Sequence, residues 1–291
     1  MELSNNHKLP QSFVDVINQI TYDPTTRDPK RLGVTTLIGS PRVKLLTVRH
    51  WSKLTEDVAD HLWRIMGSAV HYVLEKATSE DRLTEEKFVE DVGDGFTIVA
   101  KPDIYDKVSC SVEDYKFTSV WAVMHDIKTD WVNQLNCYAW LLRKRGYEVK
   151  ELWVDAIVKD WRRGEQRKYD DYPAVPFKRI KLPLWTFEEQ EIYIKERLEI
   201  YKNALPLADD DLPECTSEER WARPDTYAVM KNANKRATRV LDSREDAEGH
   251  IAWLQNKDQK SKYTVVKRPG SNMRCEEYCL MKDYCSQYKK G

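Results

Sequence analysis

The chain has 291 residues, of which 41% are hydrophobic and 33% are charged, and its formal net charge is -1 at pH 7. This composition is typical of a globular protein and excludes disordered and fibrous classes. The near-neutral balance excludes a general electrostatic attraction to nucleic acid, so binding of DNA or RNA would require a local basic groove or metal ions.

The first residues, MELSNNHKLPQSF, contain no apolar stretch of the kind that a signal peptide has, and no window reaches 18 apolar residues. The sequence therefore predicts no signal peptide and no membrane span, and we expect a cytoplasmic protein. Thiols stay reduced in the cytoplasm, so the six cysteines do not indicate a disulfide framework. Cysteines that lie close together indicate metal binding instead.

Residues 1–54 contain turn signals and short apolar stretches, and the Gly, Ser and Pro residues of GVTTLIGSPRVKLL predict a loop-rich entry segment packed on the core. From residue 55 to 77, apolar residues recur at spacings of three and four, which predicts an amphipathic helix. After the turn VGDG, the segments FTIVAKPDIYD (96–106) and KVSCSVEDYKF (107–117) are predicted strands, because they alternate and are rich in β-branched residues.

A second helix is predicted over residues 130–145, closed by Gly146 at the position after its last turn. VKELWVDAIVK (149–159) is a predicted strand, and residues 185–204 are a predicted helix. The order helix, strand, strand, helix, strand indicates an α/β (α+β) fold, with a mixed central sheet flanked by helices over residues 55–205.

The character of the sequence changes after residue 205, where LPLADDDLPEC forms a polar connection bounded by prolines. Residues 206–291 are predicted to form a smaller C-terminal unit. Its expected elements are a strand near 237–243, a helix near 243–256, a strand at 262–268 and a cysteine-rich tail.

Two strands carry side chains suited to phosphodiester hydrolysis. Asp114 and Lys116 are two residues apart and therefore share a face of their strand, whereas Glu113 points to the other face. Asp103 follows Pro102 on the preceding strand, and a hairpin between the two strands would bring both carboxylates to one metal ion. The metal would polarise the phosphate, and the lysine would orient water or neutralise charge.

The helix before these strands carries Gly67, His71 and Glu75 at successive spacings of four, hence on one face. Gly67 would allow a close approach, and His71 would supply an imidazole ligand. A single histidine on a helix is more often a satisfied polar residue than a ligand, and a D-x-K triplet alone is weak. The prediction therefore rests on the order and spacing of the whole set.

G-x-x-x-H-x-x-x-E on a helix, then Pro-Asp, then Asp-Tyr-Lys with its aspartate eleven residues later, resembles the RecB-like branch of the PD-(D/E)XK nucleases. Gln134 and Tyr138, one turn apart on the next helix, resemble the Q-x-x-x-Y motif of that branch. The resemblance covers roughly residues 65–160 and implies a restriction-endonuclease-like core. Within that branch, the sequence is similar to CRISPR-associated iron–sulfur exonucleases and their bacteriophage-encoded relatives. A bacteriophage-encoded relative would be located in the cytoplasm of a bacterial host.

The resemblance implies a role for each matching residue. Asp103, Asp114 and His71 would bind Mg²⁺ or Mn²⁺, and Lys116 would be the catalytic lysine. Gln134 and Tyr138 would brace the site or contact the DNA backbone. Glu75 is a further candidate for the catalytic set.

Cys275, Cys279 and Cys285 form C-x3-C-x5-C, which leaves a tetrahedral metal site one ligand short. Cys215, just after the domain boundary, is the expected fourth ligand. Cys110, placed on a predicted strand, and Cys137, inside a predicted helix, are expected to be packed as small hydrophobic residues.

The resemblance implies a [4Fe–4S] cluster held by the four cysteines. The chain departs from the usual pattern, because the first pair is normally C-x2-C and the distant cysteine normally precedes the nuclease core. Zn²⁺ therefore remains the alternative metal. Either metal would play a structural role, by coupling its binding to the folding of the C-terminal unit.

DNA is the expected partner, with single strands or ends preferred, and the expected activity is that of an exonuclease. The alternatives are an endonuclease of the same fold and an inactive, metal-stapled DNA-binding protein. A homo-oligomer or a recombination or replication protein partner is compatible with the sequence, and no membrane partner is expected. The basic residues expected to line the DNA path are Arg143, Lys144, Arg145, Arg162, Arg163, Arg167, Lys168, Lys231, Lys235, Arg236 and Arg239. Two aromatic residues among them, Trp161 and Tyr169, are expected to stack on bases of a single strand.

Overall fold

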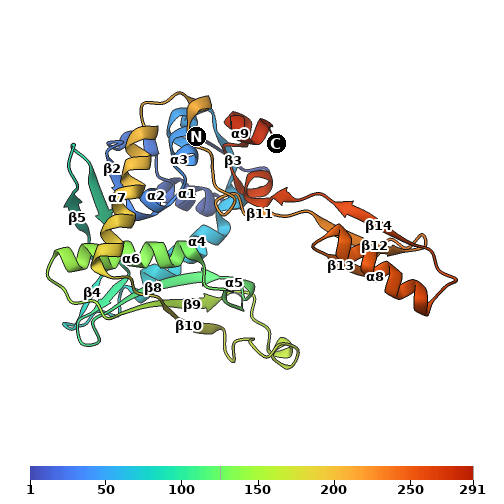
Figure 1. Cartoon of the computed structure of the whole chain (residues 1–291). Coiled ribbons are helices and arrows are strands. Elements are labelled where there is room, and N and C mark those ends of the chain that lie inside the picture. Colours follow the sequence, from blue (N-terminus) through green and yellow to red (C-terminus); the bar gives the residue numbers. More distant parts are fainter. Residues whose placement is uncertain (125, 291) are drawn as a thin grey trace. The chain divides into compact units, whose positions relative to one another are not determined.

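The computed structural model describes residues 1–124 and 126–290, and the chain divides into two compact units, Met1–Ala208 and Asp209–Gly291 (Figure 1). Residues 1–54 belong to the first of these units. Within the described residues, no helix is long and apolar enough to cross a membrane.

The first unit is built around a mixed five-stranded sheet, which confirms the predicted fold class. Its strand order is β10-β9-β8-β7-β4; the central pair β8–β9 is parallel and the other pairs are antiparallel. The strands are β4 (Arg82–Thr84), β7 (Ile104–Asp106), β8 (Ser111–Thr118), β9 (Glu151–Val158) and β10 (Phe177–Leu182).

Helices cover this sheet and the smaller sheets beside it. Helix α6 (Thr129–Lys144) packs on β8 and β9, and α7 (Phe187–Ala204) packs on α6 (Figure 1). The smaller sheets have the orders β2-β6-β5 and β1-β3. The remaining elements are β1 (Glu2–Ser4), β2 (Arg31–Gly33), β3 (Thr55–Asp57), β5 (Phe88–Asp91), β6 (Thr97–Ala100), α1 (Gln11–Ile20), α2 (Val34–Ile38), α3 (Pro41–His50), α4 (Leu62–Leu74) and α5 (Trp121–Met124).

The ends of α6 and α7 follow from local sequence. Gly146 has φ +85, so it takes the left-handed conformation that ends α6, as predicted. Thr186 caps α7 in a reciprocal pair with Glu189, each side chain bonding the other residue's backbone N–H. The apolar face of α6 is then buried, with Leu135, Leu141 and Leu142 no more than 1% exposed.

The N-terminal segment is helical where the sequence analysis expected a loop-rich stretch, so that expectation was wrong. GVTTLIGSPRVKLL forms α2 and most of α3. The Ser40 hydroxyl accepts a hydrogen bond from the Val43 backbone N–H, and Pro41 occupies the first helical position. Ser-Pro therefore starts a helix here instead of marking a loop.

The helix predicted from residue 55 begins later than expected. Residues 55–57 form β3, which pairs in parallel with β1, and a short 3₁₀ turn, Val58–His61, precedes α4. Asp57 and Asp60 form a capping box at that turn. The predicted helical segment therefore contains more than one element, because its first residues, 55–57, pair with strand β1 from the start of the chain.

The first predicted strand, 96–106, is two strands in two different sheets. β6 ends at Ala100 and pairs with β2 and β5, whereas β7 begins at Ile104 and pairs with β4 and β8. Pro102 lies between them and has no N–H to give to a ladder, so the chain changes sheet there.

The second predicted strand starts later than expected. Residues 107–110 form a turn in which the Asp106 carboxylate accepts from the backbone N–H groups of Val108 and Ser109. Cys110 lies in this turn, with φ +55, and not on a strand. Placing Cys110 on a strand was therefore wrong, because the Asp106 side chain favours a turn over continued pairing.

The second unit contains the expected elements. Its sheet has the order β13-β12-β14, with α8 packed on one face around Val229, Ala247 and Tyr263. A short pair, β11–β15, precedes the tail. The elements are β11 (Ala222–Arg223), β12 (Thr226–Lys231), β13 (Arg239–Leu241), α8 (Arg244–Lys257), β14 (Tyr263–Arg268), β15 (Ser271–Asn272) and α9 (Ser286–Lys290).

Candidate active site

Three carboxylates lie side by side across three adjacent strands. In the register of β4, β7 and β8, Thr84 pairs with Ile104 and Ile104 pairs with Glu113. One residue beyond these pairs, the strands carry Glu85, Asp103 and Asp114. The Glu85 backbone N–H donates to the Asp103 carbonyl at 3.0 Å, which continues the ladder past the end of β4. The pairing of the strands therefore gathers the acidic side chains.

Asp103 is held firmly in this arrangement. Its Oδ2 atom accepts a hydrogen bond from the Tyr115 backbone N–H at 2.6 Å, and the residue is only 7% exposed. The other carboxylate oxygen, Oδ1, faces His71. The expected hairpin between the Asp103 and Asp114 segments is present, since β7 and β8 pair in antiparallel fashion.

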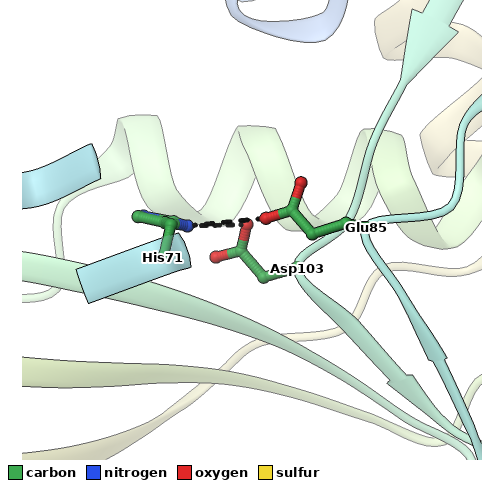
Figure 2. A group of neighbouring side chains, drawn as sticks. All are labelled: His71, Glu85 and Asp103. Atoms are coloured by element: carbon green, nitrogen blue, oxygen red, sulfur yellow. Dashed lines mark ion pairs between the residues drawn. The ribbon is translucent and has the colours of Figure 1, made fainter. Parts of the chain in front are cut away.

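His71, on α4, points at two of the carboxylates (Figure 2). Its Nδ1 atom lies 3.3 Å from Asp103 Oδ1 and 3.7 Å from Glu85 Oε1. One ligand atom from each of the three residues lies within 4.8 Å of the other two. An imidazole and two carboxylates offer the nitrogen and oxygen donors that Mn²⁺ accepts and the oxygens that Mg²⁺ prefers. The donor set therefore fits a hard divalent cation.

Glu85 was not identified from the sequence, which pointed to Glu75 instead. Glu75 ends α4 and lines the same cleft, but it is outside the three-residue group and pairs with the adjacent Lys76 at 3.5 Å. Glu85 makes a second ion pair, with Lys101. It was missed because β4 is only three residues long and lies in a highly charged stretch, so no local pattern marks its end as special.

A connected chain of polar contacts joins two residues of β8 to two residues of α6, namely Asp114, Lys116, Gln134 and Tyr138. Lys116 Nζ lies 2.6 Å from Asp114 Oδ2 and donates to Gln134 Oε1 at 3.0 Å. Gln134 Nε2 donates to Asp114 Oδ1 at 3.2 Å and to Tyr138 Oη at 2.8 Å. The strand thus supplies the ion pair, and α6 supplies the amide and the phenol that hold it in place.

Asp114 itself lies beneath the cleft. It is 2% exposed and is not part of the three-residue group around His71. Glu113 lies on the opposite face, where its Oε1 atom accepts from Arg179 Nη2 at 2.5 Å and from Ser111 Oγ at 3.0 Å. The alternation along β8 therefore separates Asp114 and Lys116 from Glu113.

Burial and neighbouring charges shift the pKa values in this region. Burial raises the pKa of Asp114 from 3.8 to about 6, against the opposing effect of Lys116. The hydrogen bond from His71 to Asp103 raises the pKa of His71, because it favours the imidazolium form. Burial raises the pKa of Tyr138 well above its usual value, so its hydroxyl stays protonated.

A solvent-open cleft of about 590 Å³ lies over the His71–Glu85–Asp103 group. Positive charge enters it from Arg64, Lys101 and Lys116. Aromatic rings line it as well, and Tyr72 is 61% exposed. The cleft therefore combines a group of carboxylate and imidazole donors, positive charge and aromatic rings in one place.

The four cysteines of the expected cluster all lie in the second unit. Burial raises the pKa of Cys275, and the neighbouring thiols of Cys279 and Cys285 raise it further. Two hydrogen bonds join Cys215 to Gln287, from the Cys215 N–H to Oε1 at 2.8 Å and from Nε2 to the Cys215 carbonyl at 2.9 Å. The fold therefore brings the distant cysteine next to the tail.

The four cysteines lie in the same unit, but their sulfur atoms do not form a compact group. Within residues 209–290, no three cysteine sulfurs lie within 4.8 Å of one another. Cys137, in contrast, is 1% exposed inside α6, and burial raises its pKa to about 12. A thiol with such a pKa is a packed apolar side chain, as the sequence analysis expected.

Several basic residues of the expected DNA path serve the fold. Arg143 donates to the Trp185 and Val149 carbonyls and to Gln190 Oε1, which holds α6 to the start of α7. Lys144 and Arg145 pair with Glu90, and Lys168 pairs with Glu165. Arg162, Arg163 and Arg167, which follow β9, are exposed. Lys235, Arg236 and Arg239 in the second unit are exposed as well.

The two aromatic residues expected to stack on bases have partners within the protein. Trp161 Nε1 donates to the Pro173 carbonyl at 2.8 Å. Tyr169 is 41% exposed and meets Trp121 edge-on, with 5.6 Å between ring centroids. Tyr72 lines the cleft itself, and Lys76 Nζ lies 4.4 Å from the centroid of its ring.

No protein-family model matches the chain, and no curated protein has significant sequence similarity to it. The solved structures that the chain matches include the following two. The crystal structure of SSO0001 is 14% identical with a TM-score of 0.43, over 68% of this chain and 86% of that one. The phage-related exonuclease from Haemophilus somnus 129PT is 12% identical with a TM-score of 0.27, over 65% and 77% of the two chains. Similarity at this level does not indicate a function.

Proposed function

We propose that the chain is a metal-dependent nuclease that hydrolyses phosphodiester bonds of DNA, as an exonuclease acting on single strands or ends. One observation carries the proposal. The His71–Glu85–Asp103 group lies at one open cleft, and the Asp114–Lys116 ion pair lies at the next strand position, with Lys116 lining the same cleft. Cation ligands next to a lysine are the combination that phosphodiester hydrolysis requires.

The residues that would hold Mg²⁺ or Mn²⁺ are His71, Glu85 and Asp103, with Asp114 at the adjacent strand position. A divalent ion bound there would polarise the scissile phosphate and lower the pKa of the attacking water. In the reaction, the water oxygen bonds to phosphorus and the bond from phosphorus to the departing sugar oxygen breaks.

Lys116 contributes through its position. Its side chain lines the cleft and is 24% exposed, while Asp114 and Gln134 fix its Nζ atom from below. A fixed ammonium group at the edge of the cleft orients the attacking water and stabilises the negative charge that develops on the phosphate oxygens. It needs no rearrangement during the reaction, and this is why such preorganised charge is effective.

We also propose that Cys215, Cys275, Cys279 and Cys285 hold a [4Fe–4S] cluster, with Zn²⁺ as the alternative metal. The proposal is supported by the joining of Cys215 to the tail through Gln287 and by the mutual influence of the three tail thiols. The metal would be structural and would link two segments that are distant in the chain.

The deciding experiment is digestion of end-labelled single-stranded, double-stranded and circular DNA with Mg²⁺ or Mn²⁺. Wild type is compared with Lys116→Ala and with Lys107→Ala, an exposed lysine on the turn before β8. We expect wild type and Lys107→Ala to shorten linear DNA, with a loss of at least about 100-fold in Lys116→Ala.

The alternatives give other results. Cleavage of circular DNA would identify an endonuclease. DNA binding without cleavage by wild type in either metal would refute the nuclease proposal and leave a DNA-binding protein.

A further inference from the structure

The first unit contains a second cavity, separate from the nuclease cleft. Its volume is about 520 Å³, and its walls come from the segment between α1 and β2, from α3, and from the end of α7. No residue that lines it also lines the cleft over His71. The cavity therefore needs an explanation of its own.

The cavity is rich in positive charge. Among the described residues, four that line it are basic, namely Arg27, Arg31, Lys44 and Arg49, and one, Asp28, is acidic. The Asp28 carboxylate accepts a hydrogen bond from the Lys30 backbone N–H at 2.8 Å, so one of its oxygens serves a local turn. The wall thus carries a clear excess of cations.

Three of these basic residues, Arg27, Arg31 and Lys44, have no carboxylate partner within the described part of the chain. Lys44 is half-buried, and burial together with the nearby Arg27 lowers its pKa. Within residues 1–124 and 126–290, no carboxylate oxygen lies within 4.0 Å of the charged nitrogens of Arg27, Arg31 or Lys44. A half-buried ammonium group beside a guanidinium is less stable than the same group in water, and a bound anion would compensate its charge.

The remaining walls suit the uncharged part of a ligand. Leu45 and Tyr201 are 3% and 2% exposed, and Val48 and Leu205 line the same space. Arg49 donates to the Leu205 carbonyl at 3.1 Å, which fixes that guanidinium at the rim. The cavity lies within the size range of sites for small organic ligands, which are mostly apolar with a few placed charges.

We propose that this cavity binds a phosphate-bearing ligand of nucleotide size. The phosphate would lie between Arg27 and Lys44, with Arg31 as a further cation, and the apolar walls would hold the rest of the molecule. Phosphate is favoured over a carboxylate because several cations converge and because guanidinium groups match its oxygens in geometry.

The test measures binding directly, in EDTA, so that no hydrolysis contributes. Thermal unfolding and calorimetric titration of the full chain are recorded with dAMP, inorganic phosphate and adenosine. We expect dAMP to raise Tm and phosphate to do so more weakly, whereas adenosine leaves Tm unchanged. The proposal would be overturned if neither dAMP nor inorganic phosphate raised Tm, or if adenosine raised Tm as much as dAMP.

Variants locate the binding. Lys44→Met keeps the apolar stem and removes the buried charge, so the ligand-free variant should be at least as stable as wild type, with dAMP affinity at least about tenfold lower. Arg27→Gln should weaken dAMP binding similarly, and it provides the measurement if Lys44→Met does not fold. Lys53→Gln, an exposed lysine outside the cavity, should bind dAMP like wild type. Unchanged affinity in Lys44→Met and Arg27→Gln would place the ligand elsewhere and refute the site.

The same variants identify the source of the phosphate. Short oligonucleotides with a 5′-phosphate or a 5′-hydroxyl are titrated in EDTA into wild type and Lys44→Met. If only the phosphorylated oligonucleotide binds more weakly to the variant, the ligand is the phosphorylated end of a DNA strand. If both bind as they do to wild type while dAMP binding is lost, the ligand is a free nucleotide. Neither result depends on nuclease activity, so failure here leaves the proposed function untouched.

Discussion

Lys116 Nζ lies 2.6 Å from Oδ2 of Asp114, two residues earlier on the same strand, and the two side chains differ sharply in environment. The Asp114 carboxylate is buried, whereas Lys116 reaches the cleft with 24% of its side chain exposed. A buried carboxylate therefore anchors the lysine at the surface where a phosphate would bind. The arrangement is stabilising for the lysine and costly for the aspartate, and both consequences can be measured.

Gln134 is predicted to position Lys116. Gln134→Leu removes the acceptor at 3.0 Å from Nζ, so we expect kcat to fall about tenfold with KM nearly unchanged. Tyr138→Phe is the matched control, because it removes an acceptor of Gln134 without touching Lys116. Its kcat should stay within about twofold of wild type. Steady-state kinetics on labelled DNA would separate the two, and an equal loss in both variants would contradict the assigned role.

Glu85, and not Glu75, is predicted to hold the divalent ion. Glu85→Gln removes a charged ligand next to His71 and Asp103, and we expect Mn²⁺ affinity to fall at least about tenfold. Glu75→Gln leaves that group intact and should bind Mn²⁺ like wild type. Titration calorimetry gives both affinities without DNA. A larger loss in Glu75→Gln than in Glu85→Gln would reverse the assignment.

Asp114 is predicted to make the metal-free protein less stable as pH rises. Its folded-state pKa of about 6 is above its ordinary 3.8, so the folded protein holds the proton more tightly than the unfolded chain. Its contribution is therefore fully present below pH 3.8 and is lost as pH rises through about 6. In EDTA, Tm of wild type should fall by a few degrees over this interval relative to Asp114→Asn.

The raised pKa of His71 acts in the same direction at higher pH, and Asp114 is one of its smaller causes. The difference between the two proteins therefore contains the Asp114 carboxyl and its small effect on His71. Thermal unfolding in matched buffers is the measurement. If Tm depended on pH in the same way in wild type and Asp114→Asn, ionisation of the buried Asp114 carboxyl would not lower the stability of the fold.

Tyr72 is predicted to favour single-stranded substrates. Its ring is 61% exposed and lines the cleft, and stacking of one base on such a ring contributes about 1–3 kcal/mol. Tyr72→Ala should raise KM for single-stranded DNA about tenfold and affect duplex DNA less, whereas Tyr72→Phe should behave like wild type. Trp253→Ala, an exposed ring on α8, is the control. Equal effects on both substrates would argue against stacking.

Cys215 is predicted to bind the same metal as the three tail cysteines. Cys215→Ser should lower the metal content of the purified protein and its Tm, because the link between the two segments is lost. Cys110→Ser, in the first unit, should retain full metal content. Elemental analysis for iron and zinc, with the visible spectrum, distinguishes a brown iron–sulfur protein from a colourless zinc protein. Full metal content in Cys215→Ser would remove this residue from the site.

Local periodicity was enough to predict which side chains of the candidate active site share a face of their strand or helix. The two-residue repeat of a strand placed Asp114 and Lys116 on one face and Glu113 on the other, as Lys116–Gln134 and Arg179–Glu113 contacts show. The helical repeat placed Gln134 and Tyr138 one turn apart, and their side chains do meet. These relationships depend only on residues close together in the chain.

Tertiary structure decided the rest. Glu85 joined the site because the short strand β4 pairs with β7. The two sides of Pro102 lie in different sheets because β6 pairs with β2 and β5, whereas β7 pairs with β4 and β8. The basic cavity needs α3 and α7, whose lining residues Lys44 and Tyr201 are far apart in sequence. Sequence patterns determine which face a side chain takes within its own element, whereas burial free energy and strand pairing, which act between distant segments, determine which elements meet.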